Sequence, residues 1–294
     1  MTIRFDDIGN RLKAFRLGSG LSADEIAGRL GISRTALYRF EKGEVAKIDT
    51  LEKLSELLDV SVPTLLGVGV EYMASAVSFF ERLRQVEETT DHIVVLAGPV
   101  SFLLASPAFH EMLEEVLIES IPDGVPDRDR ALEQINELMP ILRQRKEAYD
   151  LRRPGILNLI SGAEIDRFLR NGLVGRFDLS GDVLRSRRAR ARQETEHLTD
   201  MMETEPIGVQ IGVVPGTLPH ASFQIFRQPD RKVLALSPFR LGEQPNVLGG
   251  IAMITSAPEA LSLHERTVQE MWLRALKGPA AARFMRGLFA GLSD

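Results

Sequence analysis

The sequence predicts a multidomain protein in which a small all-α domain of five short helices precedes a larger α/β domain. The chain has 294 residues, of which 44% are hydrophobic, so it is long enough and apolar enough for more than one core. Up to about residue 66, apolar side chains recur at helical spacing between short turns. From residue 90 onward, short β-rich runs alternate with helical stretches. We expect an all-α domain at 1–69, a connecting helix at 70–89 and an α/β domain at 90–294.

The composition excludes several classes of protein. The chain has no cysteine, which rules out a disulfide framework and thiolate metal sites. No apolar run approaches the roughly 20 residues of a membrane helix, and the N-terminal stretch is acidic where a signal peptide would be apolar. The formal net charge of -5 argues against a general nucleic-acid coat, although a local basic surface can still face phosphate. We expect a cytoplasmic protein with no membrane partner, cofactor or metal.

The first two helices are indicated by their apolar spacing and by the residues at their ends. The first helix carries three apolar residues at helical spacing, Ile8, Leu12 and Phe15. The second begins after Ser22, which has the spacing of a capping box with Glu25. Gly31 supplies the C-terminal stop of this helix.

The third helix starts almost at once, with Ser33 as its N-cap and Gly43 as its end. Its apolar residues share one side: Ala36, Leu37 and Phe40. The other side carries polar and basic residues: Arg34, Thr35, Tyr38, Arg39 and Lys42. Two further short helices are expected, one after Asp49 and one at 62–66.

Two helices joined by a tight glycine turn, the second beginning with polar and basic residues, can lay a recognition helix in the DNA major groove. The alternative is a plain bundle with a solvated basic helix, since residues 1–70 hold ten basic and ten acidic side chains. The guanidinium fork of arginine matches guanine O6 and N7, which makes Arg34 and Arg39 candidates for base readout. Lysine suits phosphate better. Tyr38 either contacts the DNA backbone or acts as a half-buried prop.

The segment IAGRLGISRTALYRFEKGE, followed by LEKLSELLDVSVPTLL, resembles the DNA-binding domain of the XRE, or lambda-repressor-like, helix-turn-helix regulators over about residues 7–67. This resemblance implies a transcriptional regulator, a repressor, that binds double-stranded operator DNA. It implies that Arg34, Thr35 and Arg39 contact base edges, with Lys42 and Lys47 at phosphates. Ser33 and Tyr38 complete the set of candidate DNA-binding residues. Many members have glutamine at the second residue of helix 2, where this chain has Ala23.

The connecting helix carries an apolar stripe with 3-4-3 spacing: Val70, Met73, Val77 and Phe80. Such a stripe must be covered. One interpretation is packing on the same chain. The other is the contact surface of a homodimer, because one recognition helix reads only a few base pairs and two-fold pairing extends the site.

The α/β domain is indicated by six β-rich runs: HIVVLAG, GILNLIS, IGVQIGVV, SFQIFR, KVLALS and GIAMITS. Helices are expected between and after them, at 108–119, 128–149, 163–170, 182–203 and 262–276, with Pro140 kinking or splitting the second. The stretch from ILRQRKEAYDLRRPGILNLISGAEIDRFLRNG to FMRGLF resembles the uncharacterised domain that follows an XRE module in many bacterial regulators. That resemblance brings no known ligand.

One helix of this domain contains a run of five arginines: Arg185, Arg187, Arg188, Arg190 and Arg192. They predict either a site for an anionic small-molecule effector or a solvated helix of salt bridges to the acidic residues that follow. We therefore expect a ligand-sensing domain, with an oligomerisation or partner-binding module as the alternative. A hydrolytic domain is the third interpretation. It depends on His110, Glu111 and Glu114, which approach a zinc-peptidase helix but lack its second histidine.

Overall fold

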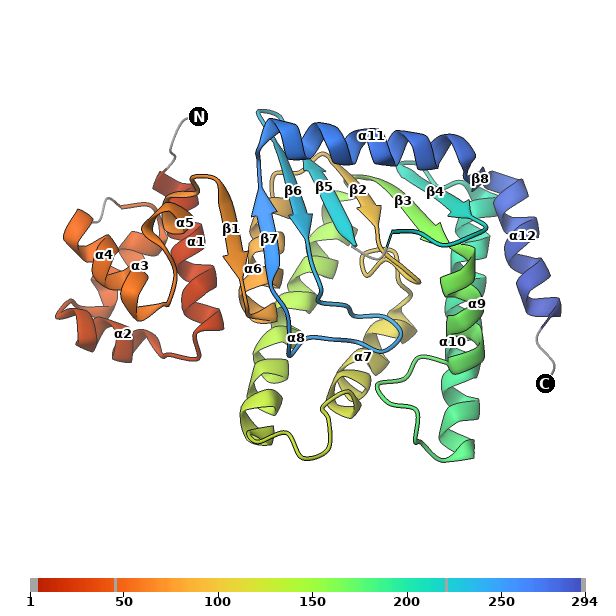
Figure 1. The fold of residues 1–294 in the computed structure, drawn as a ribbon, viewed down its shortest axis with the longest axis horizontal. Helices are drawn as coiled ribbons and strands as arrows, with labels where there is room; N and C mark the ends of the chain where they lie inside the picture. The colour runs from red at the N-terminus through yellow and green to blue at the C-terminus, as the bar shows by residue number, and fades with distance from the viewer. Residues whose placement is uncertain (1–4, 45–46, 220–221, 292–294) are drawn as a thin grey trace.

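The computed structural model describes residues 5–44, 47–219 and 222–291. A helical unit at the N-terminus lies beside a larger unit built on a single mixed sheet (Figure 1). The helical character of the first unit and the α/β character of the second are as the sequence predicts.

The described part of the N-terminal unit contains α1 (Phe5–Gly18), α2 (Ala23–Leu30), α3 (Arg34–Glu41), α4 (Ile48–Leu57) and α5 (Val62–Leu66). Ser22, Ser33 and Ser61 precede α2, α3 and α5, and each hydroxyl accepts a hydrogen bond from the backbone N–H three residues later. Each of these helices contributes to one core, whose most buried side chains include Leu12, Ile26, Leu37, Leu54 and Leu65.

The larger unit contains an eight-stranded sheet in the order β1-β7-β6-β5-β2-β3-β4-β8 within the described residues. The strands are β1 (Val70–Met73), β2 (His92–Leu96), β3 (Gly155–Ser161), β4 (Val209–Val214), β5 (Phe223–Arg227), β6 (Lys232–Leu236), β7 (Ala252–Thr255) and β8 (Leu276–Lys277). The β2, β3 and β4 strands run parallel, and the remaining pairings are antiparallel. The six β-rich runs of the sequence correspond to β2 through β7.

Helices cover both faces of the sheet because successive strand residues point to opposite sides. In β2, Ile93 and Val95 join one core, whereas Val94 and Leu96 join the other. The first core is shared with α6 (Ala76–Glu87), α7 (Pro107–Glu119), α8 (Arg128–Arg152), α9 (Gly162–Asn171), α10 (Gly181–Thr204) and α12 (Gly278–Ala290). The second lies under α11 (Pro258–Arg274), which crosses the sheet (Figure 1). The α8 helix continues through Pro140, so the expected split does not occur.

The connecting segment differs from its prediction. Residues 70–73 form the edge strand β1, paired antiparallel with β7, and only the part from Ala76 to Glu87 is helical. Spacing of apolar residues over four positions cannot separate a short strand from a helical turn, and the available edge of β7 decides in favour of the strand. Residues 70–89 thus belong to the sheet unit and do not form a separate linker.

The apolar stripe is consequently an interior feature of the chain. Met73, Val77 and Phe80 are 2%, 2% and 4% exposed and lie in the core beneath the sheet. Val70 pairs with Thr255 in the sheet. The interpretation as a dimer surface is therefore wrong for Met73, Val77 and Phe80, which their own chain already covers, whereas Val70 is half-buried in the edge strand β1.

Candidate DNA-binding site

The α2–α3 pair is set by local sequence at both ends of its turn. Ser22 and Glu25 form the predicted capping box at the start of α2. Gly31 ends this helix with φ at 67°, a left-handed conformation that costs glycine little. Ser33 then caps α3, with its hydroxyl accepting from the backbone N–H of Ala36 at 3.1 Å. Two residues of non-helical chain separate the turn glycine from α3, which gives the tight connection of a helix-turn-helix.

The α3 helix buries one side and exposes the other. Leu37 is fully buried in the helical core, and Phe40 is half-buried against it. Arg34, Thr35 and Arg39 are exposed on the opposite side, as the spacing predicts. The structure therefore brings the candidate base-reading residues together on one open surface, where no other part of the described chain covers them.

Tyr38 is half-buried and supports its neighbours. Its hydroxyl accepts a hydrogen bond from Arg34 Nε at 3.1 Å, and its ring lies 5.4 Å from the Arg34 guanidinium and 5.9 Å from that of Arg16. A ring between two cations is held by cation–π attraction as well as by packing. These contacts allow Tyr38 to orient the Arg34 side chain, and the interpretations of Tyr38 as a prop and as a DNA-backbone contact both stay predictions.

The α3 helix is fixed to α1 by a nearly buried ion pair. Arg16 donates Nε and Nη2 to the two carboxylate oxygens of Glu41, at 2.5 and 3.1 Å. The Glu41 side chain is only 6% exposed. This bidentate contact holds the exposed side of α3 in a defined orientation. The spacing of residues within either helix does not indicate it.

Both candidate base-reading arginines have acidic partners in the absence of DNA. Arg34 Nη1 lies 3.0 Å from Asp24 of α2, and Arg39 Nε lies 3.1 Å from Glu44. All four side chains are more than half exposed. Exposed ion pairs of this kind stabilise a protein by about 1 kcal/mol or less, so DNA can displace them at low cost.

The two candidate phosphate contacts lie beyond the end of α3. Lys42 is the exposed C-cap residue of α3, and Lys47 is the exposed N-cap residue of α4. Residues 45–46 between them fall outside the described residues.

The geometry is that of a helix-turn-helix DNA-binding protein, and the comparisons agree. The sequence model of the helix-turn-helix family matches residues 12–65. The regulator SinR of Bacillus subtilis is 41% identical over 80 residues, which cover 26% of this chain and 72% of SinR. A putative HTH-type regulatory protein of Pyrococcus horikoshii, PH1808, is 47% identical over 58 residues. The chain belongs to the XRE-type helix-turn-helix regulators.

The matches to curated relatives cover a small part of the chain. The match to PH1808 covers 19% of this chain and 18% of that protein, so the chain spans less than a fifth of that relative. Among solved structures, the archaeal chromatin protein TrmBL2 aligns with 78% of this chain and 62% of its own, at 11% identity and a TM-score of 0.31. That score is below the level of a shared fold.

The five arginines of α10 do not converge on one site. Arg187 is buried, with its side chain 3% exposed, and pairs with Glu115 and Glu119 of α7. Arg192 lies over the ring of Phe289 at 5.6 Å. Arg185 and Arg190 contact side chains of α10 itself, and Arg188 is exposed. Their spacing distributes them around the helix, so the interpretation as a salt-bridged helix describes them better than an effector site does.

The three residues of the hydrolytic interpretation have different surroundings. His110 is half-buried and packs edge-on against Phe102 and Phe109, with ring centroids at 4.6 and 5.9 Å. Glu111 and Glu114 are exposed on α7. Across the described ranges, no group of three or more histidine, cysteine, aspartate or glutamate side chains is placed to hold a metal ion. The same ranges contain no helix long and apolar enough to cross a bilayer.

Proposed function

We propose that this protein is a sequence-specific DNA-binding repressor that acts as a homodimer on operator DNA. The observation that carries the proposal is the open side of α3, where Arg34, Thr35 and Arg39 face outward from a helix anchored by Arg16 and Glu41. An α-helix fits the major groove, and bidentate arginine contacts discriminate between bases there. The similarity to HTH-type transcriptional regulators supports a DNA-binding function.

A single α3 helix reads only a few base pairs, which is the reason for proposing a homodimer. Two-fold pairing places two recognition helices on half-sites about one helical turn apart, roughly 34–36 Å. Met73, Val77 and Phe80 are buried in their own chain and Val70 is half-buried, so this stripe does not supply the contact. The dimer must use another surface.

Selection of binding sites from random duplex DNA tests this proposal. We expect an enriched motif made of two inverted half-sites, with centres about 10–10.5 base pairs apart. Light scattering of the protein bound to the enriched DNA should give two chains per duplex. A protein that enriches no motif, or binds all sequences alike, is not a sequence-specific regulator. A motif with one half-site and a single bound chain would refute the homodimer alone.

We further propose that the sheet unit senses a small-molecule ligand. The support is that polar contacts tie the two units together: Gln85 of α6 donates to the Asn10 carbonyl at 3.0 Å, and Lys13 of α1 pairs with Glu81 at 3.2 Å. Through such contacts a ligand on the sheet unit can change the position of the helix-turn-helix. The alternative is that the sheet unit is only an assembly or partner-binding module.

Thermal-shift screening of the full-length protein separates these two functions. A ligand that binds only the folded protein raises the melting temperature, and a sensed ligand must also change operator affinity. If hits bind and operator affinity stays the same in their presence, the assembly function replaces sensing. The hydrolytic function has no comparable support, because His110 packs against two aromatic rings and, among the described residues, no cluster is placed to hold a metal ion.

A further inference from the structure

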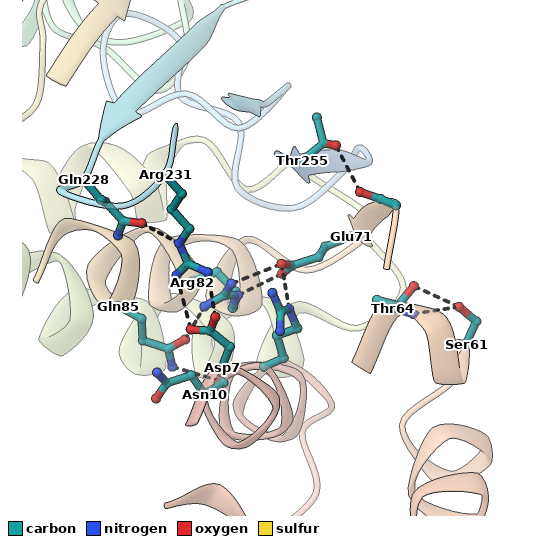
Figure 2. A network of polar contacts seen from close by, with 12 residues as sticks. Asp7, Asn10, Ser61, Thr64, Glu71, Arg82, Gln85, Gln228, Arg231 and Thr255 are labelled. Atoms are coloured by element: carbon teal, nitrogen blue, oxygen red, sulfur yellow. Dashed lines mark hydrogen bonds and ion pairs between the residues drawn. The ribbon is translucent and has the colours of Figure 1, made fainter. Parts of the chain in front are cut away.

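A cavity of about 310 Å³ lies at the junction of the two units. Its walls come from α1, from the α5–β1 connection, from α6, and from the β5–β6 turn and β7. The volume is at the small end of the roughly 300–1,000 Å³ of small-molecule sites. Figure 2 shows the polar side chains that meet here.

The deepest wall is a buried group of one carboxylate and two guanidiniums. Arg11 of α1 donates Nε to Glu71 of β1 at 2.7 Å. Arg82 of α6 donates Nε and Nη2 to the same carboxylate at 2.9 and 3.1 Å (Figure 2). All three residues are less than 8% exposed. Burial alone would raise the pKa of Glu71, but the charges of Arg82 and Arg11 hold it below its ordinary value. Glu71 is therefore ionised.

A second ion pair lines the same cavity closer to solvent. Arg231, in the β5–β6 turn, donates to the two carboxylate oxygens of Asp7 of α1 at 2.6 and 3.2 Å. Together with the buried group, three guanidiniums meet two carboxylates. Asp230 also lines the cavity, where its charge acts on Arg231. The lining therefore holds three guanidiniums and three carboxylates, and an anion that enters has to compete with these carboxylates for the guanidiniums.

The Arg11 guanidinium packs against the backbone of Gly67. Gly67 has φ at 70°, and a Cβ there would overlap the Arg11 guanidinium, so the guanidinium lies directly on the glycine backbone. Among contacts between described residues, Arg11 donates only through Nε, to Glu71. Its outer nitrogens are donors that can serve a bound oxyanion.

We propose that this junction cavity binds a small oxyanion, a carboxylate or a phosphate, through Arg11, Arg82 and Arg231. The planar forks of guanidiniums match both groups with paired hydrogen bonds. This proposal rests on the proposed sensing function. It assigns the ligand to the junction cavity and not to the arginine run of α10.

The position of the site explains how an anion acts on the helix-turn-helix. Arg11 and Asp7 belong to α1, whereas Arg82 and Arg231 belong to the sheet unit. The affinity for an anion held between them depends on how the two units are docked. By linkage, bound operator changes the affinity for the anion by the same factor as bound anion changes the affinity for the operator. Asp7 competes with the anion for Arg231.

Isothermal titration of the full-length protein with inorganic phosphate, and separately with succinate, tests the site at constant ionic strength. We expect saturable binding of at least one probe. Arg231→Gln should weaken it about tenfold, the worth of one charge-assisted contact. Asp7→Asn should tighten it several-fold, because the competing carboxylate is gone. The matched controls are Arg170→Gln and Asp166→Asn, which alter an exposed bidentate pair on α9. They should leave the affinity unchanged.

The outcomes separate the site from the sensing function. Binding of phosphate alone identifies a phosphorylated ligand, and binding of succinate alone identifies a carboxylic acid; either supports the site if Arg231 is needed. No saturable binding, equal losses in the Arg231 and Arg170 variants, or weaker binding in Asp7→Asn would overturn it. If the anion binds as expected but operator affinity does not move, the site stands and sensing fails. If another molecule shifts operator affinity while no anion binds, sensing stands and this site fails.

Discussion

Arg34 Nη1 lies 3.0 Å from the carboxylate of Asp24, so the acidic start of α2 neutralises the first arginine of α3 in the DNA-free protein. The two side chains are 56% and 69% exposed, which leaves the pair open to exchange with a nucleic acid. Asp24 also places a negative charge where a DNA backbone has to approach.

We expect Asp24→Asn to strengthen operator binding by about two- to tenfold, because the change frees Arg34 and removes a repulsive charge. Fluorescence anisotropy with labelled operator at two salt concentrations measures the effect. Asp182→Asn, which removes another exposed carboxylate next to an arginine on α10, is the control and should change nothing. Weaker binding in Asp24→Asn would mean that Asp24 orients Arg34 for DNA.

Phe80→Glu should unfold the sheet unit. Phe80 is 4% exposed, packs on Phe79 with ring centroids 5.3 Å apart, and lies under the Arg145 guanidinium. Arg145 already pairs with Glu87, so a carboxylate buried at position 80 has no free partner and costs about 4 kcal/mol of unfolding free energy. Thermal denaturation followed by circular dichroism should show a large drop in melting temperature. Leu273→Glu, at a site 81% exposed, should have almost no effect. A folded Phe80→Glu monomer would instead restore the dimer interpretation of the stripe.

His110 should make the protein less stable in mild acid. Burial, with the nearby charge of Lys146, lowers the pKa of His110 to about 4 from its ordinary 6.5. The native state therefore binds this proton at a lower pH than the unfolded state does. The folding stability that is present above pH 6.5 is consequently lost as the pH falls toward 4. The loss should be on the order of 2 kcal/mol, allowing for partial exposure of the ring. Urea unfolding of wild type and His110→Phe across this range should show a shallower decline in the variant; equal slopes would exclude His110 as the cause.

The helix-turn-helix was predictable because its determinants are local. Ser33 caps α3, and Gly31 ends α2, within three residues of each other, and the spacing of Leu37 against Arg34 and Arg39 fixes which side is buried. The supporting contact between Arg16 and Glu41 joins residues 25 positions apart. Charge alone could not select that pair from the many acidic and basic residues of α1 and α3.

In the rest of the chain, contacts between residues far apart in the sequence decide the structure, and local patterns do not predict them. Val70 and Met73 have helical spacing, but the hydrogen-bonding edge of β7, formed by residues about 180 positions later, makes them a strand. The arginines of α10 look like a cluster in sequence, yet Arg187 is drawn into the protein by α7. Glu71, Arg11 and Arg82 meet only because α1 docks on α6, which no sequence motif indicates.

The difference between a base contact and a phosphate contact gives the most direct test of α3 as the reader of sequence. Operator affinity and non-specific affinity should be measured for wild type, Arg39→Ala and Lys42→Ala over a range of salt. We predict that Arg39→Ala loses about 1–3 kcal/mol against the operator and relaxes preference at particular base pairs. Lys42→Ala should weaken all sequences about equally and lower the salt slope by about one. An unchanged base preference in both Arg39→Ala and the parallel Arg34→Ala variant would contradict the assignment of α3 as the recognition helix.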